Sequence, residues 1–190
     1  MWWPDPRGTF ARFARAASIL AVAASTGGCF QPLYGESPAV GAAGPGLRAA
    51  LSRVDIGQIP APKGSDEARL AVEIRNALIF DLTGGGEPLP PVYRLTIRMN
   101  STIADIIVDT TTTRPAIENY GINAYYTLIE IGSGKQVVNG QTFARVSYDI
   151  PGQEQRFARI RGLRDAESRA AKTIAENIRT RLAAYFAAGT

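Results

Sequence analysis

Alternating apolar and polar side chains predict β-strands in the middle of the chain. Residues 93–100 alternate strictly, as in a strand with one side in the core and the other in water. Residues 121–131 are apolar on both sides, which favours an interior place in a sheet. Gly132–Lys135 is typical of a hairpin turn, and residues 137–150 form the next expected strand, which runs back beside it. A shorter strand is expected at 53–60, where prolines follow.

The alternation changes phase after residue 100. Ala104, Ile106 and Val108 carry the apolar positions, so the apolar residues have moved to the other parity. Because side chains of a strand alternate with a period of two, this shift predicts a bulge or turn between Asn100 and Thr102. The polar stretch 109–115 is expected to be a loop or a strand end.

Two segments show helical spacing instead. Residues 65–82 repeat apolar positions every three or four residues, begin at a plausible N-cap, Ser65, and end before three glycines at 84–86. Residues 153–186 carry a longer pattern of the same kind, with Gly162 as its weak point. The order strand, helix, three strands, helix predicts an α+β two-layer sandwich, in which about four mixed strands pack two helices on one face.

The N-terminus has the pattern of a signal peptide. Residues 1–15 are basic, residues 16–24 form an apolar run too short to span a membrane, and small residues follow. Gly27 and Gly28 precede Cys29, which resembles the lipobox of bacterial lipoproteins. We therefore expect a signal peptide at 1–28. Thr26 stands where an aliphatic residue is usual, so an ordinary secretory signal followed by an unrelated thiol is the alternative.

Cys29 is the expected lipid attachment site, and residues 29–50, rich in Gly, Ala and Pro, the lipidated N-terminus and a flexible tether. The single domain would occupy 51–190. In lipoproteins generally, a residue such as Phe30 after the cysteine favours the outer membrane over retention at the inner one.

Composition excludes several kinds of site. The 190 residues contain no histidine and one cysteine, which rules out histidine-based triads, cysteine clusters for zinc and an internal disulfide. The formal charge of +4 is too small to indicate nucleic acid. We expect neither a cofactor nor a metal site, and no enzymatic reaction.

Four separated pieces of the chain resemble one family. They are "CFQPLYG" at 29–35, "YTLIEIGSGKQVVNG" at 126–140, "ARVSYDI" with "RFA" within 144–158, and "DAESRAAKTIAENIRTRLAAYF" at 165–186. Together they resemble the lipopolysaccharide-assembly lipoprotein family LptE in its alphaproteobacterial form. The resemblance implies an outer-membrane lipoprotein that plugs the β-barrel LptD, assists its assembly and contacts lipopolysaccharide. A membrane-tethered periplasmic module without an obligate barrel is the alternative.

The polar sides of the expected strands supply the candidate binding residues. Arg94, Arg98 and Arg145 all fall opposite core-facing positions, and Lys135 lies at the hairpin tip. A folded sheet could gather them into a basic patch for lipid phosphates, because arginine binds phosphate oxygens in a bidentate manner. A solvated face, or one that only lines the barrel contact, is the simpler interpretation.

Overall fold

The computed structural model describes residues 46–109, 114–149 and 156–188. The predictions for the signal peptide, for Cys29 and for most of the tether lie outside these residues, as does the expected helix start at 153–155. They stay predictions.

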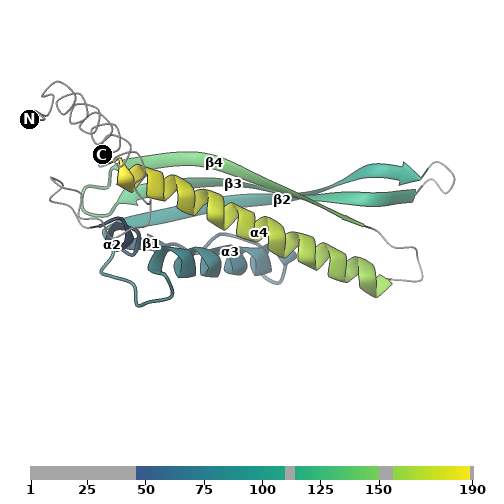
Figure 1. Ribbon diagram of the computed structural model, residues 1–190, viewed down its shortest axis with the longest axis horizontal. Coiled ribbons are helices and arrows are strands. Elements are labelled where there is room, and N and C mark those ends of the chain that lie inside the picture. The colour runs from purple at the N-terminus through teal and green to yellow at the C-terminus, as the bar shows by residue number, and fades with distance from the viewer. Residues whose placement is uncertain (1–45, 110–113, 150–155, 189–190) are drawn as a thin grey trace, which may run out of the picture. The chain divides into compact units, whose positions relative to one another are not determined.

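A four-stranded sheet forms one layer of the fold (Figure 1). Its strands are β1 (Val54–Ile56), β2 (Tyr93–Asp109), β3 (Arg114–Glu130) and β4 (Gln136–Asp149), and they lie side by side in that order. β1 runs parallel to β2, whereas β2, β3 and β4 form an antiparallel meander. The predicted four mixed strands are therefore confirmed.

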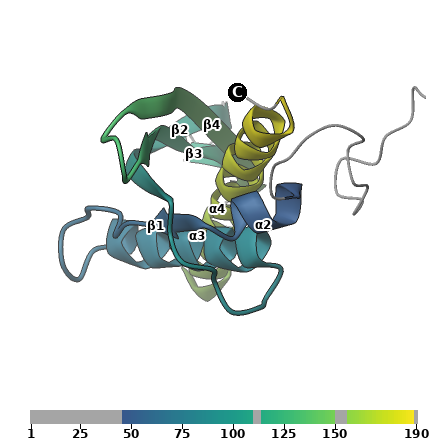
Figure 2. The same cartoon turned by 90° about the vertical axis from the view of Figure 1, so that its left-hand side faces the viewer.

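Three helices form the second layer: α2 (Leu47–Leu51), α3 (Asp66–Thr83) and α4 (Arg156–Ala187). Figure 2 looks along the strands and shows α3 and α4 side by side on one side of β2–β4. The layers bury one continuous apolar core between them. Its fully buried large side chains are Leu70, Ile74, Leu78, Leu95, Ile97, Ile122, Leu128, Ile174, Ile178 and Leu182.

The ends of α3 follow the predicted local chemistry. The Ser65 hydroxyl accepts a hydrogen bond from the Ala68 N–H at 3.1 Å, and two acidic residues occupy the first turn, where they meet the positive end of the helix dipole. Gly84 ends the helix at φ +65°, a left-handed conformation that suits a residue without a Cβ. Both boundary predictions are confirmed.

Three local expectations were wrong. The first four residues of α2 lie within the expected tether, and a third helix is present. β3 begins at Arg114 rather than at 121. The β2–β3 register is unbroken from Tyr93 to Asp105, so the irregularity lies at 105–108 and not between 100 and 102.

Ala104 shows why the phase argument failed. Its side chain is exposed on the polar face of β2, so its apolar character does not mark the core. At the same end of the sheet, α4 continues through Gly162 without interruption. A methyl group at Gly162 would meet the Tyr148 ring at 3.6 Å, an ordinary contact distance.

Candidate functional site

The face of β2–β4 that lies opposite the helices is the candidate functional site, and we call it the open face. Its described side chains are those whose neighbours in each strand point into the core: Arg94, Thr96, Arg98, Asn100, Thr102, Ala104, Ile117, Asn119, Gly121, Asn123, Tyr125, Thr127, Ile129, Asn139, Gln141, Phe143, Arg145, Ser147 and Asp149. This set contains amides, hydroxyls, aromatic rings and three arginines, against a single carboxylate, Asp149, at the end of β4. The face is therefore suited to anionic or polar partners.

Arg94 is the arginine of the open face that already has an acidic partner. Its Nε lies 3.1 Å from Asp55 Oδ2, and the strand register pairs the two residues directly. Both side chains are exposed, so the ion pair adds little to stability. It does compensate the charge of Arg94 locally, which leaves this arginine less available to a ligand.

Arg98 and Arg145 have no ion pair with any described acidic residue. Arg98 lies directly across from Tyr125 in the register, and Arg145 places its guanidinium 5.5 Å from the centre of the Phe143 ring, within the range of a cation–π contact. The Arg145 stem crosses beside Gly121, where an added Cβ would lie 3.8 Å from Arg145 Cγ.

The predicted basic residues share a region of the molecule but form no single cluster. Arg94 and Arg98 lie four positions apart, which is about 13 Å along a strand, and Arg145 lies four rows beyond Arg98 and two strands across. Lys135 is exposed in the β3–β4 turn, close in the register to the Arg94 end of β2. The parity prediction for the arginines agrees with the structure, whereas a compact patch of all four does not form.

The sheet aromatics divide between the two faces. Tyr125 and Phe143 are 54% and 63% exposed on the open face. Gln141 lies across from Tyr125, and Asn123 lies across from Phe143. Tyr126 and Tyr148 are buried on the core side. The register thus assigns two of these aromatic residues to the open face and two to the core.

On the core side, a buried carboxylate ties α4 to the sheet. Glu118 of β3 is 4% exposed, accepts a hydrogen bond from the Tyr148 hydroxyl, and accepts a second from Arg159 Nη2 at 2.9 Å. Burial, together with the bond to Glu118, raises the pKa of Tyr148 well above its ordinary value. The tyrosine thus stays a donor over the whole physiological range.

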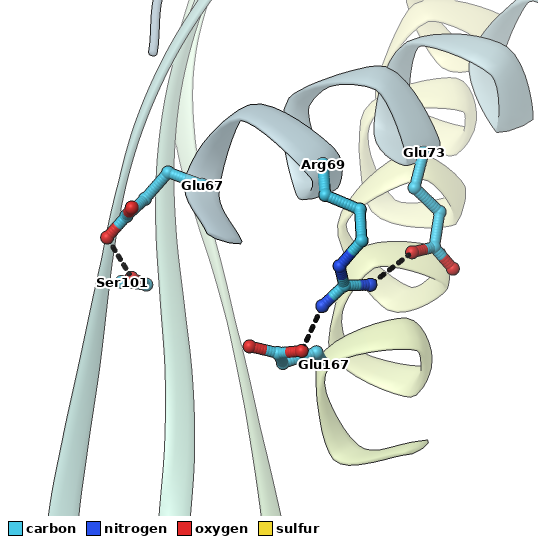
Figure 3. A network of polar contacts seen from close by, with 5 residues as sticks. All are labelled: Glu67, Arg69, Glu73, Ser101 and Glu167. Atoms are coloured by element: carbon cyan, nitrogen blue, oxygen red, sulfur yellow. Dashed lines mark hydrogen bonds and ion pairs between the residues drawn. The ribbon is translucent and has the colours of Figure 1, made fainter. Parts of the chain in front are cut away.

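A second buried carboxylate links the two long helices (Figure 3). Glu167 of α4 is 3% exposed and forms an ion pair with Arg69 of α3, which also lies 3.6 Å from Glu73. Burial raises the pKa of Glu167, and Arg69 opposes that shift. Beside this pair, Glu67 accepts a hydrogen bond from Ser101 at 3.2 Å, and hydrogen bonds lower its pKa.

Sequence reasoning missed this pair of buried carboxylates. The many charges of α4 are typical of a solvated helix face, which holds for the Arg169–Asp165 pair at 2.8 Å but not for Glu167 or Arg159. The partners lie 98 and 41 residues away in the chain, so no local pattern reports them. The contacts are structural, and they fix the layer on which the open face rests.

The described parts of the chain contain neither a cluster of metal-ligating side chains nor a helix long and apolar enough to cross a membrane. The open face, with its arginines and exposed aromatic rings, is the candidate binding surface of the described structure.

Comparisons with known proteins identify the family. The fold resembles the crystal structure of a candidate lipoprotein from Caulobacter crescentus, with a TM-score of 0.59 and 20% identity over 77% of this chain and 98% of that one. It also resembles the rare lipoprotein B of Shewanella oneidensis, with a TM-score of 0.51 and 12% identity over 69% and 93% of the two chains. A search of the curated proteins gave no match. The model of the LptE family, described as lipopolysaccharide-assembly, matches residues 51–182, which is more than half of the chain. The chain belongs to the LptE family of lipopolysaccharide-assembly proteins.

Proposed function

We propose that this protein is an outer-membrane lipoprotein that plugs the β-barrel LptD, assists its assembly, and contacts lipopolysaccharide during transport to the outer leaflet. The observation that carries the proposal is the open face. It is uncovered by helices, carries more arginines than carboxylates in its described part, and presents Arg98, Arg145, Tyr125 and Phe143.

The interior of a membrane β-barrel supports such a partnership in physical terms. Barrel strands alternate lipid-facing apolar residues with lumen-facing polar ones, so a plug meets a polar wall. A face of amides, hydroxyls and arginines can form hydrogen bonds with that wall, and exposed aromatic rings and arginines are the residue types enriched at binding hot spots. The core side is already filled by α3 and α4 and offers no comparable surface.

The proposed anchor is a lipid on Cys29. Acyl chains contribute about 0.8 kcal/mol for each buried methylene, and two or more chains hold a protein stably at a membrane. Residues 29–45 would then connect the anchor to α2. Mass spectrometry of the mature N-terminus tests this step, and an unmodified Cys29 would remove the anchor from the proposal.

Purification of the full-length protein from its native membranes in mild detergent tests the barrel partnership. A large outer-membrane barrel should co-purify in a one-to-one ratio, because a plug is enclosed by its barrel and cannot exchange freely. The matched sample is the Cys29→Ser variant, which separates loss of the anchor from loss of the partner. If no barrel accompanies the wild-type protein, the chain is a tethered periplasmic module and the plug proposal fails.

The arginines of the open face can be tested separately against lipopolysaccharide. Reversing Arg98 and Arg145 together to glutamate should weaken binding at least about tenfold, because two charge-assisted hydrogen bonds to phosphate are lost. Arg94→Glu alone should have a smaller effect, since Asp55 already compensates this charge.

The control for this charge reversal is Arg161→Glu with Lys172→Glu, which makes the same change at exposed positions of α4. Binding to purified lipopolysaccharide is measured by isothermal titration, with circular dichroism to check the fold. Equal weakening by the two double variants would mean that net charge alone matters. That result would refute a role for the open face.

A further inference from the structure

The edge of β2 is left unpaired over most of its length. β1 pairs only with Tyr93–Leu95, and the sheet order places no further described strand on that side of β2. β2 itself continues to Asp109. Beyond Leu95, therefore, one side of this strand offers its main-chain groups without a strand to receive them.

The hydrogen bonds around β1 show which residues these are. The Tyr93 N–H donates to the Arg53 carbonyl at 3.2 Å, and the Leu95 carbonyl accepts from the Gly57 N–H at 3.0 Å, so odd-numbered residues of β2 point toward β1. The register with β3 shows no shift as far as Asp105. The N–H and C=O groups of Met99, Ser101 and Ile103 therefore point to the unpaired edge.

This edge is accessible where it passes the end of the helix layer. Side chains at 102–105 alternate between the two faces of the sheet, yet all four are exposed. Ile103, on the core side, is 54% exposed. On β4, the other edge strand, exposed positions alternate with buried ones, and α4 packs along the strand. Between Thr102 and Asp105 the β2 edge is thus open on both faces as well as along its side, whereas at Met99 and Ser101 the helix layer covers one face.

Nothing in the sequence of this stretch blocks pairing. Exposed edges are commonly protected by proline, lysine or a bulge, and residues 97–105 contain neither proline nor lysine. The irregularity in the β2–β3 register begins only after Asp105. A stretch of about seven residues with unbroken register remains, which is long enough for a short added strand.

Charge indicates what kind of strand fits. Arg98 is exposed on the open face next to this edge, and no described acidic residue pairs with it. A strand added to the edge would place a side chain beside Arg98, where a carboxylate would be favourable. The exposed Ile103 on the other face would meet an apolar side chain in the same way.

We propose that the edge of β2 at Met99–Ile103 binds an extended segment of the barrel partner by β-strand addition, with an acidic side chain of that segment facing Arg98. The inference rests on the proposed barrel partnership and specifies how the partner is held. Main-chain hydrogen bonds supply the affinity in this mode, and alternate side chains supply the specificity.

Site-specific photo-crosslinking in native membranes tests the contact directly. A photoreactive residue at Thr102 should crosslink to one short segment of the barrel that contains an acidic residue, whereas the same residue at Asn139, exposed on the opposite edge strand, should not yield that segment. If the barrel co-purifies but Thr102 does not crosslink to it, the edge inference fails while the plug proposal stands. Crosslinks from Thr102 to a second copy of this chain would also overturn the inference.

A pair of substitutions at Ile103 then separates main-chain from side-chain binding. Ile103→Ala removes the side chain and keeps the N–H, whereas Ile103→Pro removes the N–H that faces the edge and is tolerated best at such edge positions. Barrel recovery should be at least about tenfold lower with proline than with alanine, which corresponds to one lost hydrogen bond plus the block to strand approach. Equal recovery overturns strand addition. If the proline variant does not fold, the Thr102 crosslinks decide.

Discussion

Replacing Arg69 with methionine is expected to lower the free energy of unfolding at pH 7 by about 3 kcal/mol. Arg69 is the ion-pair partner of Glu167, whose side chain is 4% exposed between α3 and α4. Methionine preserves the length and apolar stem of the side chain but leaves a buried carboxylate without its counter-charge. Urea denaturation of the purified domain, followed by circular dichroism, measures the change.

The matched variant, Glu167→Gln, removes the charge and keeps a hydrogen-bonding group. Its stability at pH 7 should equal or exceed that of the wild-type protein, because a buried ion pair gains little over a neutral pair once desolvation is counted. Arg69 is 38% exposed and keeps its ion pair with Glu73, so losing the charge of Glu167 leaves the arginine solvated and still paired.

The pH dependence of the Glu167→Gln comparison has a definite sign. Burial raises the folded-state pKa of Glu167 above its ordinary value of 4.5. The stability that this group contributes is therefore fully present below pH 4.5, and it is lost as the pH rises through the folded-state pKa. The Gln variant should therefore gain stability relative to wild type from pH 4 to pH 7. An Arg69→Met protein as stable as wild type at both pH values would show that the pair has no structural role.

Introducing a methyl group at Gly140 is expected to destabilise the fold by about 2 kcal/mol. Gly140 of β4 lies directly opposite Tyr126 of β3 on the core side. An added Cβ would lie 2.6 Å from the Tyr126 hydroxyl oxygen and 2.7 Å from Cζ, closer than atoms can approach, and the Tyr126 ring is 6% exposed. Alanine therefore forces the ring out of its packed position, which thermal unfolding will register as a lower Tm.

A double-mutant cycle assigns the Gly140 effect to this contact. In a Tyr126→Val background the ring is absent, so Gly140→Ala should then cost less than about 0.5 kcal/mol. Gly132→Ala is the control on an exposed turn, where an added Cβ meets nothing within 4 Å. An undiminished cost in the Val background would mean that the backbone of β4, rather than the ring, requires glycine at this position.

Local chemistry was enough to predict α3 and most of α4. The boundaries of α3 are set by side chain and backbone groups within its own first and last turns, at Ser65 and Gly84, so a single stretch of sequence contains the cause. The turn at Gly132–Lys135 is predictable for the same reason: Gly134 adopts φ +68°, and its N–H donates to the Glu130 carbonyl at 2.8 Å.

The start of β3 could not be predicted in this way. Glu118 faces the core, so the polar–apolar alternation breaks at the place where the strand is well paired on both sides. The compensation comes from Arg159 and Tyr148, which lie 41 and 30 residues further along the chain. Only the assembled layers reveal why a carboxylate is tolerated there. α2 could not be predicted, because a helix of five residues is too short to show a helical repeat of apolar positions.

The candidate site, too, could be predicted only in part. Alternation within each strand was sufficient to put Arg94, Arg98 and Arg145 on one face, because that face depends on parity alone. Their spacing depends on how the strands are aligned with one another, and the ion pair of Arg94 depends on β1, which lies 39 residues earlier. A residue's face can thus be predicted from its own strand, whereas its neighbours cannot.

The position of α4 after the meander in chain order affects when the core can close. α4 covers β3 and β4 with Ala170, Ile174, Ile178 and Leu182, yet it is synthesised only after all the strands. The meander can form hairpins early, because its contacts are between neighbouring strands. Its apolar side stays exposed to water until α4 emerges. A chain truncated before Ala170 should therefore remain open to proteases and chaperones, and the arrival of α4 sets the moment at which the molecule becomes resistant to them.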